Sequence, residues 1–163
     1  AAKAAGEMSR AIESSSQEQM SIDHAALFVG PFELLAAPYG SVFIEKNRQL
    51  MGETTARVKK FYDDAGLQVN EKEPPDHVAI ELEFMHHLCM REAEAAASGN
   101  HSEASKYREM QVAFFNTALG WIPDFCSAIR KGSENLFYRA LADCLERFMV
   151  TVSQFYKTQP LPA

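Results

Sequence analysis

The stretch "SENLFYRALADCLERFMVTVSQFY", residues 133–156, has the clearest periodicity in the sequence. Its apolar residues recur at steps of three and four, which places them on one face of an α-helix. Ser133 is a candidate N-cap because its hydroxyl can accept a hydrogen bond from a free backbone N–H, and Pro160 lies beyond the end. The stretch therefore predicts a long amphipathic helix with the apolar face Leu136, Ala140, Leu141, Cys144, Leu145, Phe148, Val152 and Phe155.

Most of the remaining sequence has the same helical periodicity. Gly66 and the capping-box-like "NHSE" at residues 100–103 indicate a helix end and a helix start. Strand signals are nearly absent, since only "SVFI" at residues 41–44 is rich in β-branched and aromatic residues. The sequence therefore predicts an all-α fold, a single-domain helical bundle over residues 1–163. Helices are expected within residues 1–28 and over about 47–65, 75–97 (the longest), 101–118 and 121–132.

Composition excludes several classes of protein. The net charge of −6 and the pI of about 5.4 argue against non-specific nucleic-acid binding, which needs a basic surface. No apolar run is long enough to span a bilayer and no signal peptide is visible, so direct membrane insertion is not expected. Cys89, Cys126 and Cys144 are odd in number and widely spaced, which is typical of free thiols in a reducing cytoplasm. No sequence signature of a cofactor site is present.

The segment "VGPFELLAAPYGSVF", residues 29–43, is irregular and unusually apolar. It contains two prolines and two glycines among aromatic and aliphatic residues, so a regular helix is not expected there. Such a segment either folds back on the core or forms the wall of an apolar groove. The sequence leaves both interpretations open.

The stretch "EKEPPDHVAIELEFMHHL", residues 71–88, combines histidines with carboxylates. Glu83 and His86 form half of a di-iron carboxylate motif, but no second Glu-x-x-His pair exists on another helix, so a metal site is not expected. Asp76 and His77 are adjacent and do not face each other as a catalytic dyad would. A structural explanation suffices for Asp76: Pro75 suits the first helical position, and Asp76 then meets the helix dipole in the first turn. Loss of that dipole interaction alone would cost ~0.3–1 kcal/mol.

Three segments, in the same order along the chain, resemble the TorD/DmsD family of redox-enzyme maturation chaperones, to which NarJ-type proteins are more distantly related. "EPPDHVAIELEFM" resembles the family's E-P-x-D-H signature and the helix that follows it. "DHAALFVGPFELLAAPYGSVF", residues 23–43, resembles the family's L-F-x-G-P segment and the P-x-x-S-V region after it. "LGWIPDF" and "LFYRALADCLERFM" fit the C-terminal pattern, so the resemblance covers residues from about 20 to 156.

The resemblance implies an all-helical chaperone of the cytoplasm without enzymatic activity. Its partner would be the precursor of a molybdopterin-containing oxidoreductase, bound through a twin-arginine leader peptide, through the apoenzyme, or through both. The chaperone would assist cofactor insertion before export. Some members exchange helices to form dimers, so a homodimer is an expectation as well. The family carries more residues before the L-F-x-G-P segment than this chain does, so the N-terminal helices are expected to be incomplete.

The same resemblance suggests candidate client-binding residues. An apolar groove would receive the middle of the leader, and acids at one end would receive its arginines. Two family positions differ in this chain, because Tyr39 and Phe43 stand where tryptophan is common. The candidate leader-binding and client-binding residues are Phe28, Phe32, Leu35, Tyr39, Ser41, Phe43, Glu73, Asp76 and His77.

Two alternatives from other classes remain open at this stage. One is a helical scaffold that binds a folded partner and never contacts a leader. The other is a metal-dependent enzyme that uses the stretch from Asp76 to His87.

Overall fold

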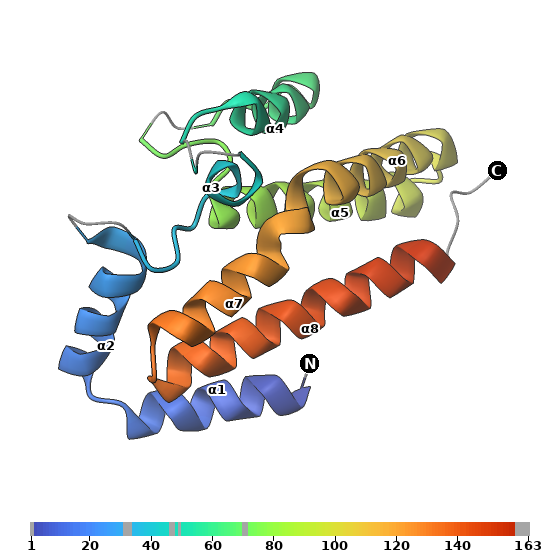
Figure 1. The fold of residues 1–163 in the computed structure, drawn as a ribbon. Helices are drawn as coiled ribbons and strands as arrows, with labels where there is room; N and C mark the ends of the chain where they lie inside the picture. Colours follow the sequence, from blue (N-terminus) through green and yellow to red (C-terminus); the bar gives the residue numbers. More distant parts are fainter. Residues whose placement is uncertain (1, 31–33, 46–47, 49, 70–71, 159–163) are drawn as a thin grey trace. The chain divides into compact units, whose positions relative to one another are not determined.

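The computed structural model describes residues 2–30, 34–45, 48, 50–69 and 72–158 (Figure 1). Every named element in these ranges is a helix, and the only bridge between extended residues there joins Tyr39 to His77. The all-α prediction is confirmed. The elements are α1 (Ala2–Ser14), α2 (Gln17–His24), the π-helical η1 (Ala25–Val29), α3 (Gly40–Ile44), α4 (Glu53–Asp64), α5 (Val78–Ala97), α6 (His101–Ala118), the 3-10 turn η2 (Leu119–Trp121), α7 (Ile122–Gly132) and α8 (Leu136–Thr158).

Helix boundaries confirm some predictions and correct others. The helix α6 coincides with the predicted range, and the Asn100 side chain accepts a hydrogen bond from the Glu103 N–H at 3.2 Å, as a capping box requires. The predicted helix over 47–65 begins only at Glu53, because Arg48 and Met51 have positive φ and leave the right-handed helical region. The helix α5 is not the longest, since it has 20 residues and α8 has 23.

The start of α8 also differs from the prediction. The helix begins at Leu136, and the Asn135 side chain accepts a hydrogen bond from the Phe137 N–H at 2.9 Å. Ser133 instead accepts from the Asn135 N–H at 3.0 Å, so it stabilises the turn before the helix. The prediction that Ser133 is the N-cap is therefore wrong by two residues.

The chain divides into two compact units. The first unit comprises Ala1–Pro38 and Ile122–Phe155, and the second comprises Tyr39–Trp121 and Tyr156–Ala163. Compact units of one chain can belong to one domain or to two, so the single-domain organisation over residues 1–163 stays a prediction.

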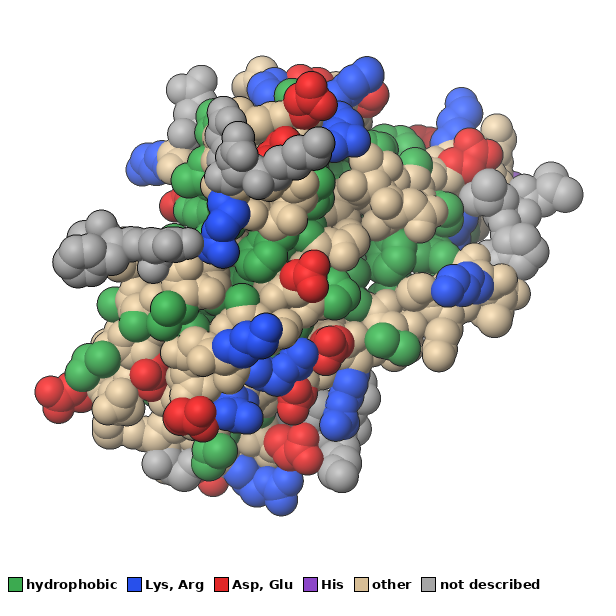
Figure 2. All heavy atoms as spheres, viewed as in Figure 1, with side chains coloured by type: hydrophobic (Ala, Val, Ile, Leu, Met, Phe, Trp, Pro, Cys, Tyr) green, Lys and Arg blue, Asp and Glu red, His purple; other side chains and the backbone are tan. Residues whose placement is uncertain are grey.

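The first unit is held together by apolar packing and by ion pairs between α7 and α8. The Phe28 ring lies 6.1 Å from that of Phe125 and 5.8 Å from that of Tyr138, measured between centroids. Arg130 of α7 pairs with Asp143 and Glu146 of α8, each at 3.0 Å. Such pairs keep charges of both signs interspersed over these helices, as the lower part of Figure 2 illustrates. The buried core residues of this unit include Ala11, Leu27, Ala36, Ala37, Ile122, Phe125, Cys126, Ile129, Tyr138, Ala142 and Met149.

The second unit is built on the antiparallel pair α5 and α6, which Figure 1 shows side by side. Gly99, with φ of +76°, makes the reversal between them. Aromatic side chains fill the space between this pair and α4: the Phe84 ring lies 4.8 Å from both Tyr62 and Phe114, edge to face. Edge-to-face pairs at this spacing stabilise a core beyond simple burial.

The short helix α3 packs closely against Trp121 in the same unit. The Phe43 ring stacks on Trp121 with 5.3 Å between centroids. A Cβ atom at Gly40 would lie 2.8 Å from the indole nitrogen of Trp121, which is closer than Cβ contacts occur. The absence of a side chain at Gly40 therefore permits the close approach of α3.

Contrary to the expectation from the sequence, one helical stretch within the described part of the chain, His101–Gly132, is long and apolar enough to cross a membrane. This is weak evidence of a membrane span, because the core helix of a soluble protein can have the same length and composition. Within the stretch, Phe114, Ala118 and Leu119 are buried.

We predict that Gly40→Ala destabilises the protein by about 1–3 kcal/mol, because the new methyl group would displace Trp121 from its stacked position on Phe43. Urea unfolding followed by circular dichroism would measure the change. Gly120→Ala is the matched control, since a Cβ there meets nothing within 4 Å. Equal effects of the two substitutions would contradict the close-packing explanation.

Candidate functional site

Asp76 lies at the centre of a buried polar network in the second unit. Its side chain is 0% exposed, and its two carboxylate oxygens accept hydrogen bonds from the Ser41 N–H at 2.7 Å and from the Thr55 hydroxyl at 3.0 Å. The Asp76 carbonyl accepts from the Gly40 N–H at 2.9 Å. One residue thus joins the start of α3, the first turn of α4 and the segment before α5.

His77, not Asp76, is the residue that caps α5. Its Nδ1 accepts a hydrogen bond from the Ala79 N–H at 3.1 Å, and the helix begins at Val78. The prediction that Asp76 occupies the first helical turn is therefore wrong, because the chain between Pro75 and His77 has not yet entered the helix. Burial lowers the pKa of His77, which agrees with a neutral ring whose Nδ1 is an acceptor.

Glu81 is a second buried carboxyl group, one turn into α5. It is 0% exposed, and its Oε2 accepts a hydrogen bond from the indole N–H of Trp121 at 3.0 Å. Burial raises the pKa of Glu81 to about 9, and the nearby Asp76 acts in the same direction. Glu81 Oε1 and the Ser41 hydroxyl have no hydrogen-bond partner within the described structure. Because of this raised pKa, the Glu81 carboxyl group is protonated and neutral near pH 7.

The predicted site residues fall in both units. Phe28 is half-buried against aromatic neighbours in the first unit, where Leu35 is 51% exposed. Phe32 lies outside the described residues. The second unit contains the others: Tyr39, Ser41, Phe43, Glu73, Asp76 and His77. A groove lined by residues of both units stays a prediction.

Within the second unit, five of these six residues lie in one connected arrangement. Tyr39 donates a hydrogen bond from its hydroxyl to Glu73 Oε2 at 3.2 Å, and its ring lies 5.3 Å from that of His77. Ser41 and Asp76 are buried together. Asp76 is therefore inaccessible to an arginine in this state, so its contribution to a client site would be indirect.

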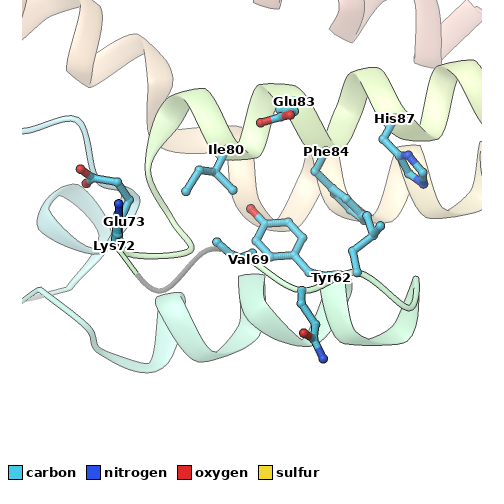
Figure 3. A pocket seen from close by; sticks show the side chains of 10 residues that line it. Tyr62, Val69, Lys72, Glu73, Ile80, Glu83, Phe84 and His87 are labelled. Atoms are coloured by element: carbon cyan, nitrogen blue, oxygen red, sulfur yellow. The ribbon is translucent and has the colours of Figure 1, made fainter.

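A cavity of about 650 Å³ opens between the end of α4, the segment after it and the first turns of α5. Figure 3 shows Glu73 and Lys72 at one end of the cavity and His87 at the other, with Tyr62 and Ile80 between them. This volume is ordinary for a site that binds a small molecule or a few peptide side chains. The lining residues are Tyr62, Leu67, Gln68, Val69, Lys72, Glu73, Ile80, Glu83, Phe84 and His87.

Of the candidate client-binding residues predicted from the sequence, only Glu73 lines this cavity. Ile80, Glu83 and His87 follow one another at steps of three and four, so they share a face of α5. That spacing was the available signal, but it does not indicate which side of the helix borders a cavity. The segment 67–69 carries no motif at all.

The metal-dependent alternative depends on clustered ligands. Among the described residues, no group of three or more His, Cys, Asp or Glu side chains lies close enough together to hold a metal ion. Cys89, Cys126 and Cys144 are free thiols in this structure.

The family of the chain follows from a match to the model of the nitrate reductase delta subunit family, which covers residues 1–127. The chain belongs to this family. The resemblance to the TorD/DmsD chaperones is thereby confirmed, since TorD proteins are among the relatives of the chain.

Relatives named Chaperone protein TorD include proteins from two Vibrio species. The protein from Vibrio parahaemolyticus is 29% identical over 134 residues, which cover 81% of this chain and 61% of the relative. The protein from Vibrio vulnificus strain YJ016 is 28% identical over 141 residues, covering 85% and 65%. The chain thus spans less than two thirds of the length of these relatives.

A solved structure gives the same result for the fold. A protein of Archaeoglobus fulgidus assigned to redox enzyme maturation matches with a TM-score of 0.57 and 25% identity. The match covers 86% of this chain and 71% of that one. It supports the helical fold over most of the chain described here.

We predict that Asp76→Ala destabilises the protein by about 1–3 kcal/mol for each buried donor that loses its partner, Ser41 N–H and the Thr55 hydroxyl. This exceeds the ~0.3–1 kcal/mol expected from a helix dipole alone. Urea unfolding would measure it, with Glu73→Ala as an exposed carboxylate control. A loss for Asp76→Ala no larger than the dipole value would contradict the network.

We also predict a specific pH dependence from Glu81. Its folded pKa is about 9, above the ordinary value of 4.5, so its stabilising contribution is complete below pH 4.5 and is lost as pH rises to about 9. Wild type should therefore lose unfolding free energy relative to Glu81→Gln as the pH rises from 5 to 9. Urea titrations at several pH values test this, and a difference that does not vary with pH would contradict the neutral buried acid.

Proposed function

We propose that this protein is a cytoplasmic chaperone for a molybdopterin-containing oxidoreductase, and that it binds the twin-arginine leader of the precursor. Membership of the family and relatives named as TorD chaperones support a role in redox-enzyme maturation. The proposed role is binding rather than catalysis. The cavity in the second unit is the observation that supports leader binding most directly.

The chemistry of a leader matches the composition of this cavity. A twin-arginine leader has a basic end followed by an apolar middle. The cavity has an apolar floor that includes Val69 and Ile80, and it also has the carboxylates of Glu73 and Glu83. Burial of the apolar segment would supply most of the binding free energy, while charge-assisted hydrogen bonds to the arginines would fix its direction.

Two finer features of the proposal come from the family resemblance. The chaperone would also contact the apo form of its client and release it once the cofactor is inserted. A homodimer, formed by exchange of helices, would be compatible with either step. Light scattering of the purified chain at several concentrations would test the dimer independently of leader binding.

We predict that the protein binds a twin-arginine leader peptide in preference to a scrambled peptide of the same composition, and that Ile80→Gln weakens this binding about tenfold. The loss corresponds to about one buried aliphatic side chain. Isothermal titration calorimetry would measure both effects.

Met90→Gln is the matched control, because Met90 is 48% exposed on the same helix and does not line the cavity. Equal affinity for the leader and the scrambled peptide would overturn leader binding. In that case retention by the apoenzyme alone would favour a scaffold that recognises a folded client. Leader binding that Ile80→Gln leaves unchanged would place the leader elsewhere on the protein.

A further inference from the structure

Glu73 and Glu83 both line the cavity, but their side chains are constrained differently. Both residues are exposed. The carboxylate of Glu73 accepts a hydrogen bond from the Tyr39 hydroxyl at 3.2 Å. For Glu83 no hydrogen bond or ion pair is present within the described part of the chain. One carboxylate of the cavity is therefore held in place, and the other retains its rotamer freedom.

Tyr39 is itself fixed by the buried network. Its backbone pairs with His77 in the isolated antiparallel bridge, and its ring packs edge to face on the His77 ring at 5.3 Å. The next two residues are anchored by Asp76, which accepts from both the Gly40 and the Ser41 N–H groups. The rigid backbone thus fixes the direction in which the Tyr39 hydroxyl reaches Glu73.

The Tyr39 hydroxyl is the hydrogen-bond donor of the pair and the Glu73 carboxylate is the acceptor. Burial and the Glu73 charge raise the pKa of Tyr39, so its hydroxyl stays protonated and donates. Glu73 keeps its second oxygen for another donor. Lys72 lies at the same end of the cavity (Figure 3), but it makes no ion pair with Glu73 in the described structure.

A held carboxylate binds a cation better than a mobile one of the same charge. Binding to a mobile side chain must fix its rotamers at a cost in entropy, whereas a side chain that is already held avoids most of this cost. An arginine could donate to the free oxygen of Glu73 while the neighbouring part of its peptide covers the apolar floor at Ile80. The structure therefore distinguishes Glu73 from Glu83 as a ligand for arginine, whereas the sequence alone gives no reason to prefer either carboxylate.

We propose that Tyr39 is a positioning residue that holds Glu73 so that this carboxylate selects an arginine directly beside an apolar peptide segment. The inference rests on the proposed leader binding. In this arrangement Asp76 and His77 do not contact the client themselves. They fix Tyr39, and Tyr39 fixes the Glu73 carboxylate that contacts the client.

The experiment compares two peptides on the intact chain by calorimetry. One is a twin-arginine leader, and the other carries citrulline in place of both arginines, which keeps the shape and removes the charge. We expect wild type to prefer the arginine peptide about tenfold. Glu73→Gln should lose this preference, and Tyr39→Phe should reduce it severalfold although the aromatic ring is retained. Combining the two substitutions should add nothing to Glu73→Gln.

Glu83→Gln is the matched control, since it removes the same charge from the same cavity. It should keep most of the preference for arginine. An equal loss in Glu83→Gln and Glu73→Gln would overturn the inference, and so would an unchanged preference in Tyr39→Phe. A wild type that binds both peptides equally well would overturn the inference while leaving leader binding intact. A wild type that binds neither peptide would overturn the proposed leader binding and this inference together.

Discussion

The second unit depends on the burial of one carboxylate, Asp76, with both oxygens hydrogen-bonded. A buried charge is tolerated only when its hydrogen bonds are supplied by fixed donors. The donors here come from the start of α3 and from the first turn of α4, so satisfying the charge also fixes where these elements lie relative to α5. Three segments that are distant in sequence thereby acquire one arrangement. The aromatic rings of Tyr62, Phe84 and Phe114 fill the space between α4, α5 and α6 in the same unit.

The helices were largely predictable from sequence, because their periodicity and end signals are local. Asn100, Gly66 and Gly99 act through bonds or backbone angles within a few residues of themselves. The errors arose where a non-local contact competes with the local signal. Pro75 suggested an early start for α5, but Asp76 is drawn into contacts with α3 and α4, so the helix starts three residues later, at Val78. No local pattern carries that information.

The site was less predictable than the fold for a related reason. The D-H motif drew attention to Asp76 and His77, and the structure assigns both a supporting position within the second unit. The cavity is bordered by residues such as Leu67 and Val69, which belong to no motif and reach it only through packing. A resemblance to a family identifies which residues matter, but it does not say how each one acts. One residue can contact a client directly, and another can act only by holding that residue in position.

The bond between Trp121 and Glu81 has a practical consequence. The chain has a single tryptophan, and that indole is buried, stacked on Phe43 and hydrogen-bonded to a carboxyl group of α5. Its emission therefore comes from one place, where α3, α5 and the end of α6 meet. The protein therefore carries a natural optical probe of its second unit, and unfolding of that unit can be followed by tryptophan fluorescence without attaching a label.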